Sequence, residues 1–300
     1  MRFKRIVHLS ENSRAQGHPG GVEKFGHYLA AAIGCEVVTP GDRPDLDDPS
    51  CLYICDAHWR LEVSPRCTAV AMMHGCAAER GHNRGKGRLQ AKLTGVPNTY
   101  FVGNSDQTIA LCKQYYDLDI PDKIWLAVDE DRYAPPIETA RPIALTATAG
   151  KGHKGHRRLK KLAKRLDGID FHNLDCGLDE EFAEFRRTDV FVHLSKHEGF
   201  AYSVLEAMAA NAAVVVTPHG IAYELQHLDI PGIYIVPEAE MNNLTRVAEL
   251  VQRAVREPRE TRAWVKEQCS IERFNRSWQT YIDRIQRGEV LPGSGEPVLG

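Results

Sequence analysis

Two glutamates with seven residues between them, Glu198 and Glu206, are the side chains of this 300-residue sequence best placed to do chemistry. The flanking pattern predicts Glu198 in a strand-to-helix turn and Glu206 one turn into the helix, and the apolar run 214–216 that follows is typical of a buried parallel strand. The N-terminus of a helix binds phosphate, and carboxylates accept hydrogen bonds from hydroxyl groups. The pair therefore favours a ligand with phosphate at one end and several hydroxyls at the other, and a nucleotide sugar is such a ligand.

The residues around these glutamates resemble a family of enzymes, the retaining nucleotide-sugar-dependent glycosyltransferases of GT-B architecture, in particular glycosyltransferase family 4. The resemblance rests on the Glu-x7-Glu spacing within the string KHEGFAYSVLEAMAANAAVVVTPHG at 196–220. It implies that Glu198 holds hydroxyls of the transferred sugar and that Glu206 holds those of the ribose. The other residues that it assigns to donor binding in this stretch are Gly199, Phe200, Ser203 and Gly220.

The segment after the predicted strand 143–148 carries the cations that the resemblance assigns to the diphosphate. The family usually has an arginine followed by a Lys-Gly pair, and this sequence has Lys154-Gly155 without the arginine. Lys151 could replace the arginine, but a lysine binds phosphate as a point charge, whereas an arginine binds it with two parallel hydrogen bonds. We expect Lys154 to stabilise the departing diphosphate, and whether Lys151 takes the place of the arginine is left open by the sequence.

Two short motifs in the first half extend the resemblance. Gly20 and Gly21 precede the first helix, where glycine lets the backbone approach a ligand and the helix N-terminus favours an anion. His74 follows the predicted strand 69–73, and the resemblance implies that it contacts the donor sugar. An imidazole suits this role because it can donate to a hydroxyl or accept from one. His74 therefore joins Lys154 and Glu198 as a predicted catalytic residue.

The chain alternates strands and helices throughout, which predicts an α/β fold with parallel sheets. Apolar runs predict strands at 6–9, 36–39, 52–55, 69–73, 99–102 and 124–126, and then at 143–148, 171–174, 190–194, 213–217 and 233–236. Two Rossmann-like domains that face each other across an interdomain cleft, as in GT-B enzymes, would place the ligand beyond the strand ends. The expected divisions are an N-terminal acceptor-side domain at 1–135, a nucleotide-sugar-binding domain at 136–272, a closing helix at 273–287 returning to the first domain, and a disordered tail at 288–300.

The composition is ordinary for a globular protein and excludes several classes. A net charge of −2 does not indicate a surface that coats nucleic acid. The sequence contains no run of about 18 apolar residues, so no membrane-spanning helix is expected. The apolar stretch at the start of the chain is too short for a signal peptide. We therefore expect a cytoplasmic protein. The eight cysteines are scattered without a CxxC pattern, which favours free thiols over zinc or disulfides. We expect no metal and no cofactor, since the family needs none.

The acceptor is the part of the reaction about which the sequence says least. The segment after His74 is basic and rich in glycine and is predicted to be a mobile loop; its cations are Arg80, Arg84, Lys86 and Arg88. Such a loop could hold an anionic acceptor such as a phospholipid head group, a phosphorylated glycan or a nucleic acid with modified bases. Nucleic acid is not favoured, because no aromatic residues interleave with the cations, and a neutral sugar remains equally open.

A second class of function remains open beside the enzyme. The missing arginine and the short first half also fit a non-catalytic nucleotide-sugar-binding protein or a partner subunit of a glycosyltransferase. Hydrolysis of a sugar nucleotide without acceptor would separate the two classes. The sequence does not specify the sugar, the nucleotide base or the oligomeric state.

Overall fold

The chain folds into two compact units, each built around one parallel sheet. The computed structural model describes residues 3–10, 21–42, 44–79, 84–134, 136–147, 152–174 and 178–293. The first unit consists of Met1–Ala127 and Glu272–Gly300, and the second of Val128–Ile271. Of the tail expected at 288–300, residues 294–300 lie outside the described part of the chain.

The first unit has a six-stranded sheet in the order β2-β1-β3-β4-β5-β6, and every pair of neighbouring strands is parallel. The strands are β1 (Arg5–Leu9), β2 (Glu36–Val38), β3 (Cys51–Asp56), β4 (Thr68–Met73), β5 (Thr99–Gly103) and β6 (Asp122–Lys123). The central strands are buried along their whole length, as expected for a parallel sheet covered on both faces. The strand order reverses between β1 and β3, which makes this the switch point of the sheet.

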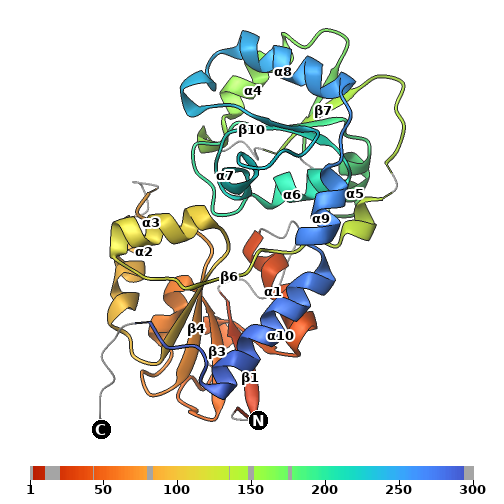
Figure 1. Cartoon of the computed structure of the whole chain (residues 1–300). Helices are drawn as coiled ribbons and strands as arrows, with labels where there is room; N and C mark the ends of the chain where they lie inside the picture. Colours follow the sequence, from red (N-terminus) through yellow and green to blue (C-terminus); the bar gives the residue numbers. More distant parts are fainter. Residues whose placement is uncertain are drawn as a thin grey trace. The chain divides into compact units, whose positions relative to one another are not determined.

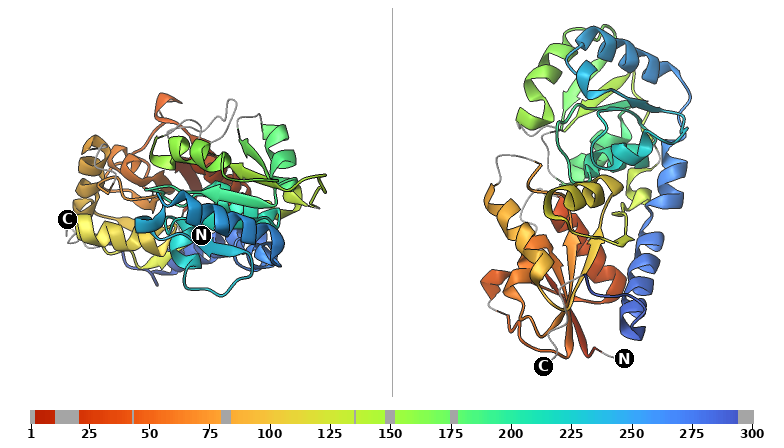
Figure 2. Two further views of the ribbon diagram at one scale, coloured as in Figure 1. Left: turned by 90° about the horizontal axis from the view of Figure 1, so that it is seen from above. Right: turned by 60° about the vertical axis from the view of Figure 1, so that its left-hand side comes forward.

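Helices cover the first sheet, and the last helix of the chain lies among them (Figures 1 and 2). These helices are α1 (Gly21–Ile33), α2 (Arg84–Ala91), α3 (Asp106–Tyr116) and α10 (Ile271–Arg287). Phe25 of α1 contacts Phe274 and Trp278 of α10, with ring centroids 6.1 and 5.9 Å apart. Gln279 also donates a hydrogen bond to the carbonyl of Ala32, at 2.9 Å. Helix α10 is therefore an integral layer of the first unit.

The second unit has a five-stranded parallel sheet in the order β11-β10-β9-β7-β8. Its strands are β7 (Ile143–Thr146), β8 (Asp170–Asn173), β9 (Val190–His193), β10 (Ala213–Val216) and β11 (Ile233–Ile235). Its helices are α4 (His156–Ala163), α5 (Leu178–Arg186), α6 (Tyr202–Ala209), α7 (Ile221–Leu225), α8 (Leu244–Arg256) and α9 (Thr261–Gln268). One core joins α4 and α8 to the sheet through Leu159, Leu162, Val192, Val215, Val247 and Val251. The switch point of this sheet lies between β7 and β9.

The predicted fold class is confirmed, and two local predictions are wrong. The strand expected at 124–126 ends earlier, since β6 is Asp122–Lys123 and the apolar residues after it are buried outside the ladder. The predicted mobile loop that carries Arg84, Lys86 and Arg88 is helical over Arg84–Ala91. Gly87 is buried in this helix, and a Cβ there would meet the backbone of Ala78 at 3.5 Å, an ordinary contact distance.

None of the helices in the described part of the chain has both the length and the apolar character that crossing a membrane requires.

Candidate functional site

Two loops meet at the switch point of the second sheet and carry the predicted diphosphate and sugar contacts. The loop after β7 leads to Lys154, and the loop after β9 leads to Glu198. The backbone N–H of Lys196 donates to the carbonyl of His153, at 3.0 Å, and this bond ties one loop to the other. Because ligands of parallel sheets bind beyond the strand ends at the switch point, these loops lie where a ligand is expected.

Gly155 lets the Lys154 loop approach the end of β9. It has φ +76°, a left-handed conformation that favours glycine, and a Cβ at this position would lie 2.9 Å from the carbonyl oxygen of Leu194. Arg158, one turn further along α4, donates from Nη1 to that same carbonyl at 2.9 Å. Lys154 is thus held at the switch point by its neighbours in sequence.

Glu198 is the centre of a charged cluster that also contains a residue not predicted from the sequence. His193, at the end of β9, places Nε2 2.9 Å from Oε1 of Glu198, while Nζ of Lys154 lies 3.8 Å from the same oxygen. Burial opposes ionisation of Glu198, but the hydrogen bond and charge of His193, the charge of Lys154 and a hydrogen bond from Ser195 lower its pKa from 4.5 to about 2. Glu198 is therefore an anion at neutral pH, and His193 must donate the hydrogen bond.

Two side chains approach the same oxygen of Glu198. Nε2 of His193 and Nζ of Lys154 both lie near Oε1. The separation of 3.8 Å between Lys154 and Glu198 is an ion pair without a hydrogen bond. The lysine can therefore turn its N–H groups to an incoming anion while keeping its charge beside Glu198.

A third loop, after β10, packs against the turn that follows Glu198. Gly220 has φ +62°, and a Cβ there would lie 2.5 Å from the carbonyl oxygen of Phe200. The N–H of Ile221 donates to this same oxygen at 2.8 Å. Gly199 and Phe200 are buried in this contact, so Gly220 fixes the backbone that leads from Glu198 into α6.

The helix α6 begins at this turn and carries the predicted Ser203 and Glu206. Its N-cap, Ala201, has φ 69° and ψ 65°, a left-handed conformation that is uncommon for a residue with a Cβ. Among the described residues no side chain caps this helix N-terminus. Ser203 lies in the first turn and is partly exposed. Helix α6 begins at Tyr202, four residues after Glu198, and the N-terminus of a helix favours an anion.

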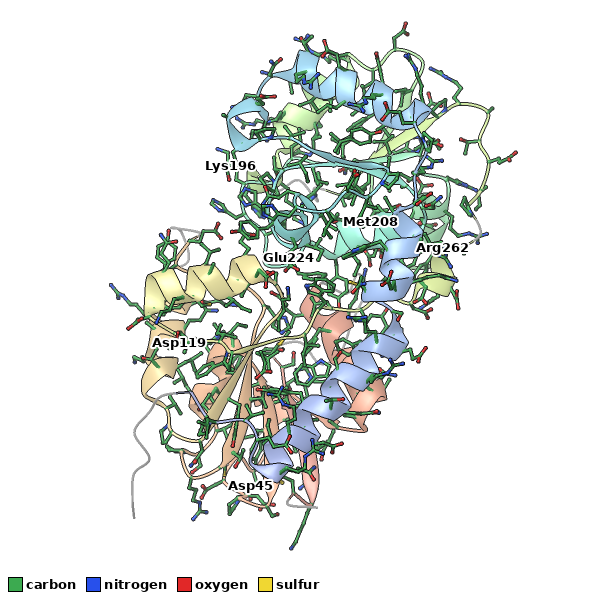
Figure 3. All side chains as sticks on the ribbon, viewed as in Figure 1. Asp45, Asp119, Lys196, Met208, Glu224 and Arg262 are labelled. Atoms are coloured by element: carbon green, nitrogen blue, oxygen red, sulfur yellow. The ribbon has the colours of Figure 1, made fainter. Side chains whose placement is uncertain are left out.

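Glu206 is almost fully buried in α6 and has a partner that sequence reasoning missed. The hydroxyl of Tyr133 donates to its Oε1 at 3.1 Å. Tyr133 ends the 3-10 helix Glu130–Tyr133 at the start of the second unit. Arg262 lies at the start of α9 (Figure 3). It holds the 3-10 helix against α6, since it donates to the carbonyl of Ala209 at 2.6 Å and also to the carbonyl of Glu130. Glu206, the residue predicted to hold the ribose, is therefore held rigidly by residues of its own unit.

His74 lies in the first unit, directly after β4. Its Nε2 is 2.8 Å from Oδ1 of Asp56, the last residue of β3, and Nε2 of His8 lies 3.2 Å from the same oxygen. The His74 side chain is 15% exposed, whereas the Asp56 side chain is 7% exposed. Asp56 and His8 were not predicted to be site residues, because they are separated by 48 positions in the sequence.

Several predicted site residues fall outside the described part of the chain or have no described side chain. Gly20, Lys151 and Arg80 lie outside it, and Arg84 begins α2 without a described side chain. Gly21 is the first residue of α1, and Lys86 and Arg88 are exposed on α2. The proposed roles of these residues therefore remain predictions.

Within the described ranges there is no group of three or more His, Cys, Asp or Glu side chains arranged to hold a metal ion.

Sequence comparison identifies the unit that contains the cluster. Residues 134–253 match the profile of the family described as glycosyl transferases group 1. This segment is a group 1 glycosyltransferase domain. Enzymes of this group transfer sugars with retention of configuration. No curated protein sequence matches the chain significantly.

Solved structures extend the likeness of fold beyond the group 1 domain. HepE of Anabaena in complex with UDP-glucose has a TM-score of 0.66 and 15% identity, and the match covers 93% of this chain and 99% of HepE. Sucrose-phosphate synthase of Thermosynechococcus elongatus has a TM-score of 0.72 and 14% identity, with 95% and 99% covered. The pneumococcal O-GlcNAc transferase GtfA, in complex with UDP and GlcNAc, has a TM-score of 0.56 and 13% identity, with 80% and 58% covered. At these identities the match establishes the GT-B fold.

Proposed function

We propose that this glycosyltransferase transfers a sugar from UDP to an acceptor hydroxyl with retention and without a metal ion. The observation that carries the proposal is the cluster of Lys154, Glu198 and His193 at the switch point of the group 1 domain. UDP-glucose in HepE and UDP in GtfA support the choice of nucleotide.

In the proposed reaction, charge develops on the diphosphate as the bond to the sugar breaks. Lys154 and the N-terminal N–H groups of α6 stabilise that charge, and groups of this kind act most strongly where they are already oriented before reaction. Glu198 accepts hydrogen bonds from hydroxyls of the transferred sugar. Glu206 accepts those of the ribose. The departing phosphate takes the proton of the acceptor hydroxyl, so the mechanism requires no protein base.

The charge of the cluster suits this division of roles. An ionised Glu198 beside Lys154 repels a phosphate group and attracts hydroxyl donors, so the sugar and the diphosphate have opposite preferences for the two side chains. His193 fixes the carboxylate of Glu198 beside Lys154, because it donates to Oε1 from the buried side. The cluster therefore favours one orientation of a UDP-sugar.

We propose an anionic acceptor, such as a phosphorylated glycan or a lipid head group, bound by the first unit. Exposed Lys86 and Arg88 on α2 support this choice, because each adds positive charge to the same helix. Rates with matched phosphorylated and neutral acceptors test it, and equal rates would contradict it. Nucleic acid with hydroxylated bases remains the less favoured anionic acceptor.

Nucleotide release from UDP-, GDP-, ADP- and TDP-sugars, measured with and without EDTA beside thermal-shift binding, tests the proposed activity. We expect a UDP-sugar to raise the unfolding temperature and to be hydrolysed slowly, equally well in EDTA. Stabilisation without release would favour the alternative, a non-catalytic nucleotide-sugar-binding protein or partner subunit. Absence of any stabilisation would overturn both, and inhibition by EDTA would overturn metal independence.

A further inference from the structure

His74 is one of three polar side chains, from three neighbouring strand ends of the first unit, that form a hydrogen-bonded chain. His8 lies near the end of β1, Asp56 ends β3, and His74 follows β4. Both histidines place Nε2 against Oδ1 of Asp56, at 3.2 Å for His8 and 2.8 Å for His74. Since β1 and β3 flank the switch point of this sheet, the chain lies where ligands of such folds bind.

The exposure of the three side chains increases in one direction along this chain. His8 is fully buried, Asp56 is nearly so, and His74 reaches the surface with 15% of its side chain. A buried carboxylate is costly unless it is paired and hydrogen-bonded. Within the described ranges, the side-chain partners of Asp56 are the two histidines. The buried pair of His8 and Asp56 therefore holds the ring of the partly exposed His74 in place.

The protonation of this chain follows from its geometry. Burial opposes ionisation of Asp56, but attraction to His8 and the hydrogen bonds from the rings of His74 and His8 bring its pKa well below the ordinary value. An ionised carboxylate only accepts hydrogen bonds. Each ring must therefore carry a proton on Nε2, and Nδ1 is the second hydrogen-bonding atom of His74.

The ring of His74 is also fixed by its packing and by its backbone. Phe25 meets it edge to face, with centroids 4.7 Å apart and planes at 74°. The side chain of Asn104 donates to the carbonyl of His74 at 3.2 Å, and Gln90 donates to the carbonyl of Gly75 at 3.0 Å. The direction in which Nδ1 faces is thus determined before any ligand binds.

We propose that Asp56, supported by His8, is a positioning residue that holds His74 as the Nε2–H tautomer, so that Nδ1 accepts a hydrogen bond from a hydroxyl of the transferred sugar. The identity of the ligand rests on the proposed function. Asp56 does not touch the sugar, because its side chain is buried. Its role is to choose the tautomer, as carboxylates do for catalytic and metal-bound histidines.

The tautomer can be measured without any activity, by long-range proton–nitrogen NMR correlations of the histidine rings in the free protein. His74→Gln assigns the signals of His74. We expect the Nε2–H pattern for His74 in the wild-type protein and loss of that pattern in Asp56→Asn, because an amide can donate to Nε2 as well as accept from it. An unchanged His74 pattern in Asp56→Asn would overturn the proposal.

Kinetics with the UDP-sugar then test whether the tautomer is used. We expect Asp56→Asn to lower kcat/KM by about 10- to 100-fold, the usual cost of removing a group that orients another, while the affinity for UDP stays the same. Unchanged kinetics, or an equal loss of UDP affinity, would show that Asp56 has no positioning role in the reaction. If the wild-type protein turns over no UDP-sugar, the proposed function fails, and the NMR result alone decides whether Asp56 holds His74.

A matched pair of variants at His8 separates positioning from packing. Gln places its amide nitrogen close to the position of Nε2 and can donate to Asp56, whereas Leu fills a similar volume without a donor. We expect His8→Gln to keep the His74 tautomer and most of the activity, and His8→Leu to behave like Asp56→Asn. Equal behaviour of the two variants would overturn the supporting role of His8.

Discussion

Replacing Glu198 with glutamine removes the charge of the central carboxylate while its amide oxygen can still accept from His193. The fall of the Glu198 pKa from 4.5 to about 2 corresponds to about 3 kcal/mol, at about 1.4 kcal/mol for each pH unit. Because the folded-state pKa is the lower one, this stability is fully present above pH 4.5 and is lost as the pH falls toward 2. From about pH 6 to about pH 3, the wild-type protein should lose about 2 kcal/mol that the variant does not lose.

Urea unfolding of the wild-type protein and of Glu198→Gln at several pH values within this range measures the effect. The difference in unfolding free energy between the two should shrink steadily as the pH falls. Glu240→Gln, which removes an exposed carboxylate of the same unit, is the control for general acid effects. A difference between wild type and Glu198→Gln that does not change with pH would refute the reasoning that His193 and Lys154 hold Glu198 as a buried anion.

Three other substitutions test separate parts of the site. Lys154→Met should lower UDP-sugar turnover at least about 100-fold, or about 3 kcal/mol of transition-state stabilisation, and steady-state rates near those of the wild type would remove the lysine from the mechanism. Tyr133→Phe removes the donor to the buried Glu206, so it should cost about 1–3 kcal/mol of stability and weaken UDP binding. Thermal unfolding and calorimetric titration measure these two effects. Unchanged UDP affinity would mean that Glu206 does not hold the ribose. Gly220→Ala forces a Cβ against a carbonyl at positive φ and should cost at least about 1 kcal/mol in urea unfolding, and a neutral result would contradict the close packing of this loop.

Most of the fold could be predicted because the strands are short apolar runs between helical periodicities. The valines of β10 and the residues of β9 are buried on both faces, and such strands show continuous hydrophobicity. Where hydrophobicity was the only signal, the prediction of a strand at 124–126 was wrong. The apolar residues after Lys123 are buried, but they do not pair as a strand. The two glycines of α2 favoured a loop, yet Arg84–Ala91 is helical, and Gly87 is buried within it.

The part of the site that is contiguous in sequence was predictable, and the part assembled by folding was not. Glu198 and Glu206 belong to one strand-turn-helix, so their string identifies them together. His193 ends a buried strand and has no feature in the sequence that distinguishes it from a histidine of the core. Tyr133 reaches Glu206 across 73 positions, and Asp56 and His8 meet only because β1 and β3 are neighbours in the sheet. Contacts of this kind depend on sheet order, which local patterns do not encode.

A crystal structure of the protein with a bound UDP-sugar tests the central claim most directly. It should show an oxygen of the diphosphate about 3 Å from Nζ of Lys154, at hydrogen-bond distance, and a hydroxyl of the sugar on the carboxylate of Glu198, with His193 still bonded to Oε1. A UDP-sugar bound away from the switch point of the second sheet, or with its diphosphate out of reach of Lys154, would contradict the account.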